Sequence, residues 1–239
     1  MTARDTFERD AASDERAFYL QRAFRALLDA MARPGEVAEL PEMPARGAED
    51  AGEAGLLGSS CVIVDVLIDA ATAFAVAGAG SKAAERVLAR RTHARPADIA
   101  EAPYVLVPLA VRGSDAASKI AALYPGTLRD PHLGATAVVE CGTLVGLDAT
   151  GSRAGSSSGS AEVSTWRLSG PGIKGCSEIV CDRGDAIAAR LERADEFPCG
   201  IDLVLVDGAG HVAAIPRSAR VEAALSDVVV RREGQPWDM

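Results

Sequence analysis

A strongly apolar segment, Ile201 to Val206, is followed at once by a turn and by a second apolar segment. The turn is Asp207 to Gly210, and the second segment runs from His211 to Ile215. Short apolar runs on either side of a turn rich in Gly and Asp are typical of a β-hairpin. We therefore expect two paired strands in this part of the chain.

Helical and extended patterns alternate before this hairpin. The first helix is predicted from Ser13, which is placed to cap it, to Pro34-Gly35, which would end it. Its apolar residues recur with helical spacing on one face, at Leu20, Phe24, Leu27, Leu28 and Met31. This helix is the clearest single element that the sequence predicts.

Shorter segments complete the predicted secondary structure. Further helices are expected over 57–68, 82–91, 114–123 and 185–194, and extended segments over 36–40, 72–76, 104–111, 134–145 and 162–168. Asp65 and Asp69 would share one face of the helix over 57–68. Small and polar residues predict loops at 41–55 and 150–160 and a flexible tail at 227–239. Without a repeat or a long linker, we expect one mixed α/β domain over 1–239, with its core at 13–222.

The charge and the cysteines limit the partners and the location. A net charge of −9 argues against nucleic acid or an anionic membrane as the main partner. The apolar runs are too short to cross a bilayer. The five cysteines include no C-x-x-C pair, and the polar start of the chain does not look like a secretory leader. We therefore expect a cytoplasmic protein with reduced thiols.

Two glycine-rich segments resemble parts of nucleotide-binding motifs. Gly155 to Ser160 could suggest a phosphate loop, but no Lys-Ser or Lys-Thr pair ends it and the next predicted element is a strand. Gly78-Ala79-Gly80 lies between a predicted strand and helix, but Ala83 stands where the third glycine of the dinucleotide fingerprint belongs. A linker and an ordinary β–α turn are the favoured interpretations.

The residues that usually carry catalysis are few and scattered. The three histidines are isolated, so we expect neither a metal site nor an acid–base pair of histidines. The only lysines are Lys82, Lys119 and Lys174, which limits any mechanism that needs an amine nucleophile. Cys176 and Cys181 lie five residues apart, which fits no zinc template.

Two segments with Gly and Pro are less ordinary. Leu168 to Ile173 ends a predicted strand, and Phe197 to Asp202 begins another. Such turns let a backbone approach another backbone or a ligand closely, although both could simply be rigid corners. Arg217, which follows Ile215 and Pro216 just after the hairpin, is an arginine that could point inward.

In these segments the chain resembles the PhnH family, whose members are subunits of the bacterial carbon–phosphorus lyase core complex. The matching pieces are Phe24 to Gly35, Leu168 to Ile173, Phe197 to Leu203, Ile215 to Arg217 and Val221-Glu222, in the same order and spacing over about residues 18–222. The chain departs from the family at Cys199, where Leu is usual, in a longer loop at 150–160, and in a longer tail.

The resemblance implies a fold and partners. The expected fold is that of pyridoxal-phosphate-dependent transferases, with a central mixed β-sheet flanked by helices, in a form that has lost the cofactor site. No cofactor is therefore expected. The implied partners are a second copy of the chain, in a homodimer, and the sister subunits of the lyase complex.

The implied function is accessory. Together, the subunits of the complex form ribose-1-alkylphosphonate 5-triphosphate from ATP and an alkylphosphonate, before a separate radical subunit breaks the C–P bond. We expect this chain to be structural and not catalytic alone. The alternatives are a free-standing pyridoxal-phosphate enzyme and a phosphonate- or nucleotide-binding protein. Candidate substrate or interface residues are Arg33, Gly35, Pro171, Gly172, Gly200, Asp202 and Arg217.

Overall fold

A computed structural model describes residues 3–147, 152–157 and 162–224. Its α-helices are α1 (Ala3–Ala32), α2 (Ala45–Ala54), α3 (Gly58–Leu67), α4 (Ser81–Thr92), α5 (Gly113–Ala121) and α6 (Gly184–Leu191). A 3-10 helix, η1, covers Pro131–Leu133. The predicted tail at 227–239 lies outside the described residues.

The strands form two sheets. The first has the order β1-β11-β10-β5-β4-β2-β3 and is mixed: β10, β5, β4, β2 and β3 are parallel, and β11 pairs antiparallel with both β10 and β1. Its strands are β1 (Ala38–Glu39), β2 (Ala73–Val76), β3 (Arg95–Pro96), β4 (Tyr104–Val107), β5 (Thr136–Cys141), β10 (Asp202–Asp207) and β11 (His211–Ile215). The predicted hairpin of β10 and β11 is confirmed, and so is the mixed sheet flanked by helices.

The second sheet is antiparallel throughout and has the order β12-β8-β9-β6-β7. Its strands are β6 (Thr143–Leu147), β7 (Arg153–Ser157), β8 (Ser164–Ser169), β9 (Ser177–Cys181) and β12 (Arg220–Ala223). This sheet was not expected from the sequence.

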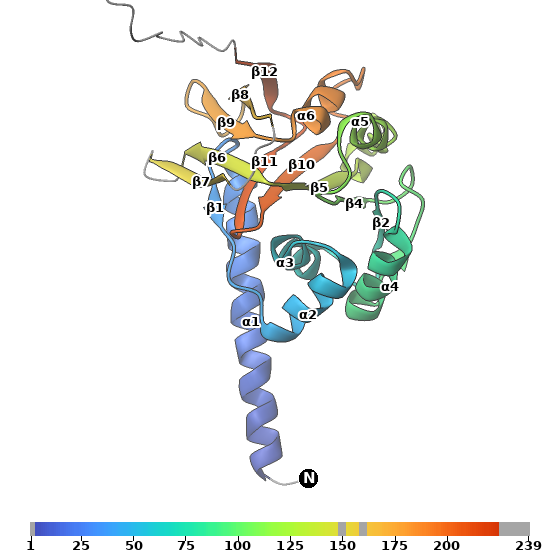
Figure 1. Cartoon of the computed structure of the whole chain (residues 1–239), viewed down its shortest axis with the longest axis vertical. Helices are drawn as coiled ribbons and strands as arrows, with labels where there is room; N and C mark the ends of the chain where they lie inside the picture. The colour runs from blue at the N-terminus through green and yellow to red at the C-terminus, as the bar shows by residue number, and fades with distance from the viewer. Residues whose placement is uncertain (1–2, 148–151, 158–161, 225–239) are drawn as a thin grey trace, which may run out of the picture.

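The first sheet is buried on both faces, which explains why its strands are continuous apolar runs. Alternate residues such as Val204 and Val206 belong to a core shared with α1, α2, α3 and α4. Their neighbours, such as Leu203 and Leu205, belong to a second core shared with α5, α6 and the second sheet. Figure 1 shows the same layers, with α2, α3 and α4 on one side of β10, β5 and β4, and α5 and α6 on the other.

Three predictions about the helical part of the chain were wrong. Helix α1 begins at Ala3, so Ser13 lies inside it and does not cap it. Residues 45–54, predicted as loop, form α2, because its alanines and glutamates favour helix more than its glycines oppose it. Helix α3 confirms the helix over 57–68, but it ends at Leu67 and Ile68 is extended, so Asp69 does not share a face with Asp65.

The strand over 134–145 is really two strands in different sheets. The chain passes from β5 to β6 at Gly142, where the Asp182 carboxylate accepts the main-chain N–H groups of Gly142 at 3.0 Å and Thr143 at 3.1 Å. Part of the predicted linker, 153–157, is strand β7 paired with β6, and its residues 150–151 and 158–160 lie outside the described ranges. The strand over 104–111 ends early, just before Pro108.

Across the part of the chain that the structure describes, no helix is both long and apolar enough to cross a membrane.

Candidate functional site

The predicted site residues fall into two groups. In the first, the turn between β8 and β9, with Pro171 and Gly172, lies on the end of α1. Gly172 has φ +81, and a Cβ atom there would overlap the main-chain carbonyl of Ala32. Gly35 has φ +89, and a Cβ atom there would overlap the Ser177 hydroxyl. Glycine is therefore needed at both positions for close packing of α1 on the second sheet.

Arg33 belongs to this first group but points to its own neighbours in the sequence. Its guanidinium pairs with the carboxylates of Glu36 at 2.8 Å and Asp29 at 3.3 Å. Its side chain is 44% exposed, so these are surface ion pairs of small energetic value.

The second group contains Gly200, Asp202 and Arg217, at the amino end of β10. Arg217 donates its main-chain N–H to Asp202 Oδ1 at 2.6 Å and its Nη2 to Asp202 Oδ2 at 2.5 Å. The same guanidinium donates to the carbonyls of Pro131 and Gly134. Arg217 thereby fastens the loop before β5 to the start of β10.

The two groups approach each other through main chain. A Cβ atom on Gly170 would lie 3.2 Å from the Ser218 carbonyl oxygen, so the first turn packs beside the residue that follows Arg217. Between Arg33 and Arg217 themselves, the described residues show no contact. The described residues therefore form no single site that contains both arginines.

The carboxyl edge of the parallel strands holds two buried acids that sequence reasoning missed. Ligands commonly bind at this edge in open α/β sheets. Glu140 of β5 accepts hydrogen bonds from the main-chain N–H groups of Leu57 at 2.7 Å and Leu109 at 2.8 Å, and from the Ser60 hydroxyl at 2.7 Å. Its carboxylate therefore holds the start of α3 and the end of β4 together.

Asp207, at the end of β10, has a similar role. It accepts the main-chain N–H groups of Ala209 and His211, both at 2.9 Å, which fixes the hairpin turn. It also accepts the Ser156 hydroxyl at 2.6 Å and contacts His211 Nδ1 at 2.8 Å. An acid directly after an apolar strand was the available signal for Asp207.

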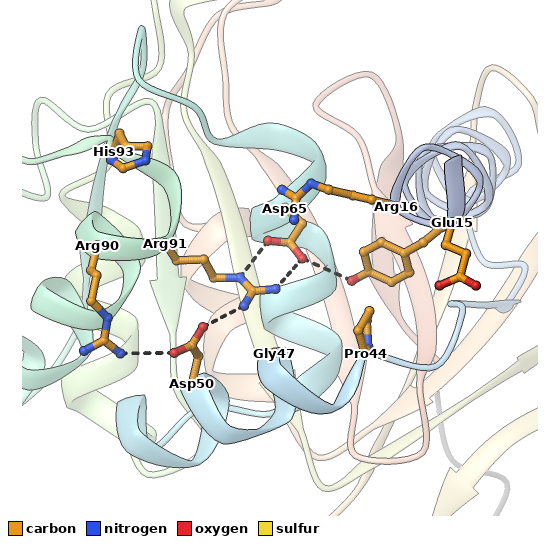
Figure 2. Close-up of a pocket in the computed structure, with 10 residues that line it drawn as sticks. Glu15, Arg16, Pro44, Gly47, Asp50, Asp65, Arg90, Arg91 and His93 are labelled. Carbon is orange, nitrogen blue, oxygen red and sulfur yellow. Dashed lines mark hydrogen bonds and ion pairs between the residues drawn. The ribbon is translucent and has the colours of Figure 1, made fainter. Parts of the chain in front are cut away.

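A cavity of about 720 Å³ lies between α1, α2, α3 and α4. Figure 2 shows Arg91 at its centre, between Asp65 and Asp50. Arg91 donates Nε and Nη2 to Asp65 at 2.7 and 2.6 Å and Nη1 to Asp50 at 2.9 Å. The hydrogen bonds to Asp65 raise the pKa of Arg91, despite its burial. Every nitrogen of this guanidinium is thus occupied by a carboxylate of the same chain.

Two further groups beside this cavity, Tyr19 and Cys61, have pKa values that their surroundings raise. The Tyr19 hydroxyl donates to Asp65 at 3.2 Å, and burial together with that carboxylate raises the pKa of Tyr19. Burial raises the pKa of the Cys61 thiol to about 12. A thiol with this pKa has almost no thiolate at neutral pH and is a poor nucleophile.

The lysines do not fit a pyridoxal-phosphate site. Lys82 is 89% exposed and pairs with Glu85, three residues along the same helix. Lys119 pairs with Asp115 on α5, and Lys174 is exposed in the turn between β8 and β9. A Schiff-base lysine must reach an enclosed cofactor, and these side chains point to solvent or to their own helix. In the described ranges, no group of three or more His, Cys, Asp and Glu residues is placed to hold a metal ion.

Comparison with known proteins gives one family match. Residues 11–222 match the model of a family described as bacterial phosphonate metabolism protein (PhnH). A search of curated proteins found no match. The matched range contains both Gly/Pro segments, 168–173 and 197–202, nearly all of the two sheets and most of α1. Because it covers far more than half of the 239 residues, the chain belongs to the PhnH family of bacterial phosphonate metabolism proteins.

Proposed function

We propose that the chain is an accessory, non-catalytic subunit of a cytoplasmic carbon–phosphorus lyase assembly. With its sister subunits, it helps to form ribose-1-alkylphosphonate 5-triphosphate from ATP and an alkylphosphonate, with release of adenine. In this proposal the chain is a homodimer that needs no cofactor. Its family membership supports the pathway.

One observation carries the accessory role: charged groups at both ends of the parallel sheet, two of them buried, bind the chain's own main chain. Glu140 is 2% exposed, and its three hydrogen bonds join elements far apart in sequence. Asp207 is fully buried and holds the hairpin turn, and Arg217 holds the loop before β5. A catalytic acid or cation must contact substrate and change partners, which these contacts would oppose.

Exposed apolar side chains support assembly with other subunits. Phe24 and Leu28 are 54% and 53% exposed, and they lie four residues apart, which places them on one face of α1. Phe197 is 72% exposed in the loop before β10. Large apolar groups that gather on a surface are typical of protein interfaces.

Co-expression with the sister subunits tests this function. We expect an affinity tag on this chain to retain the sister subunits through size-exclusion chromatography, at a mass that includes two copies of the chain. Recovery of the chain alone would contradict the proposal. Phe24→Asp should weaken retention, whereas Arg22→Gln, which changes the charge by the same amount at an exposed position on another side of the same helix, should not. Unchanged retention of Phe24→Asp would remove this face from the interface.

A free-standing pyridoxal-phosphate enzyme is not favoured by the lysine positions. We expect no absorbance band near the edge of the visible range when the cofactor is added to the isolated chain. A band that disappears in Lys174→Ala would support that alternative instead.

A further inference from the structure

A small cavity beside the second group of predicted residues contains three arginines. Its volume is about 160 Å³, and it lies between the end of α6, the loop that follows, and the start of β10. Arg190, Arg193 and Arg217 all line it, together with Gly200 and Asp195. The sequence analysis selected Gly200 and Arg217 from this set but not Arg190.

Two of these arginines are fully occupied. Arg193 pairs with Asp195 at 2.6 Å and also donates to main-chain carbonyls at the end of α5. Arg217 pairs with Asp202 at 2.5 Å and donates to the carbonyls of Pro131 and Gly134. Each of the two carboxylates near the cavity therefore already has its own arginine.

Arg190 differs from both. It donates only through Nη2, to the carbonyls of Pro216 at 2.7 Å and Ala219 at 3.2 Å. Within the described residues, no carboxylate forms an ion pair with it, and its Nε and Nη1 have no hydrogen-bond partner. Those two nitrogens are not sealed from solvent, because Ser177 Oγ is the sole fully buried side-chain polar atom without a partner in the described ranges.

The electrostatics agree with this geometry. Three arginines face two aspartates, so the cavity carries one positive charge in excess. Burial lowers the pKa of Arg190, although Asp202 and Asp195 oppose the effect. This is the expected response of a cation that has lost water without gaining a paired anion.

We propose that this cavity binds one small oxyanion, such as a phosphate, phosphonate or carboxylate group, beside the guanidinium of Arg190. Nε shares one edge of the planar guanidinium with the occupied Nη2, and Nη1 lies on the opposite edge, so the anion accepts a single charge-assisted hydrogen bond from one of the two free nitrogens. The cavity is smaller than the roughly 300–1,000 Å³ of pockets that enclose drug-sized ligands, so it fits a single anionic group and not a whole nucleotide. Binding here does not depend on the accessory role.

Calorimetry on the intact chain tests the site. Inorganic phosphate, methylphosphonate and acetate are titrated at constant ionic strength, and their relative affinities identify which oxyanion the cavity prefers. We expect one site in the unmodified chain and an affinity at least about ten-fold lower in Arg190→Gln. Arg190→Lys, which keeps the charge but not the planar guanidinium, should bind with intermediate affinity. Arg220→Gln removes the same charge from a nearby exposed position and should bind as the unmodified chain does.

Absence of binding for all three anions would overturn the proposal, and so would equal affinity in Arg190→Gln. A second readout needs no substitution. Cys199 lines the cavity, so a bound oxyanion should slow its alkylation, measured by peptide mass spectrometry. The exposed Cys176 in the same chain is the internal control. An unchanged alkylation rate at Cys199 with saturating anion would also contradict the site.

Discussion

The cavity around Arg91 and the cavity around Arg190 differ in size and in how their charges are used. The first is more than four times larger and holds several charged side chains, but Asp65 and Asp50 occupy every nitrogen of Arg91. The second is small, but Arg190 keeps two nitrogens without a partner. Arg16 also lines the first cavity but is exposed, so the comparison teaches that unoccupied donors on a partly buried arginine, and not volume or charge density, identify the better candidate for a ligand.

The largest expected effect is at Arg91. Arg91→Met would leave Asp65, whose side chain is 2% exposed, without its cation, and should destabilise the protein by about 3 kcal/mol. Arg90→Met on the same helix removes only the two ion pairs of a 59% exposed arginine, with Asp50 and Glu53, and should leave stability unchanged within error. Urea denaturation measures both. Equal losses for the two variants would show that the Arg91 cluster is not a structural ion pair.

The second effect separates Arg217 from Arg190. Arg217→Gln would leave the buried Asp202 without its cation and should cost about 2 kcal/mol of unfolding free energy. Arg190→Gln leaves no acid unpaired and should cost about 1 kcal/mol or less. The same denaturation experiment compares them. If Arg190→Gln were the more destabilising change, the assignment of Arg190 as the unoccupied arginine would be wrong.

The smallest effect concerns pH. Burial of Asp50 acts to raise its pKa, but hydrogen bonds from Arg91 and Arg90 outweigh it and hold the pKa below the usual 3.8. Because the pKa is depressed in the folded state, this contribution to stability is complete above 3.8 and is lost as the pH falls through the folded pKa. Stability measured below pH 4 should therefore decline less steeply in Asp50→Asn than in the unmodified chain. An identical slope would exclude this contribution.

The sequence predicted the elements whose signals are local. The hairpin of β10 and β11 and helix α3 follow from apolar runs and turn residues, and the structure has both. The division of 134–145 between two sheets could not be predicted in this way. It depends on Asp182, which lies about forty residues away and binds the main chain at Gly142 and Thr143.

The candidate site shows the same limit. Arg217 was selected because it follows a strand and a proline, but its pairing with Asp202 depends on how β10 and β11 meet. Arg190 lies at the end of an ordinary helix and gives no sequence signal. Arg190 is a candidate because its Nε and Nη1 have no hydrogen-bond partner among the described residues. This can be recognised only when the tertiary contacts are known.

The most direct test of the accessory role is adenine release from ATP in the presence of methylphosphonate. The isolated chain and the co-purified assembly would be compared at equal concentration by liquid chromatography. We predict adenine release by the assembly and none above background by the chain alone. Release by the isolated chain at the rate of the assembly would contradict the account, because it would require a catalytic site within this subunit.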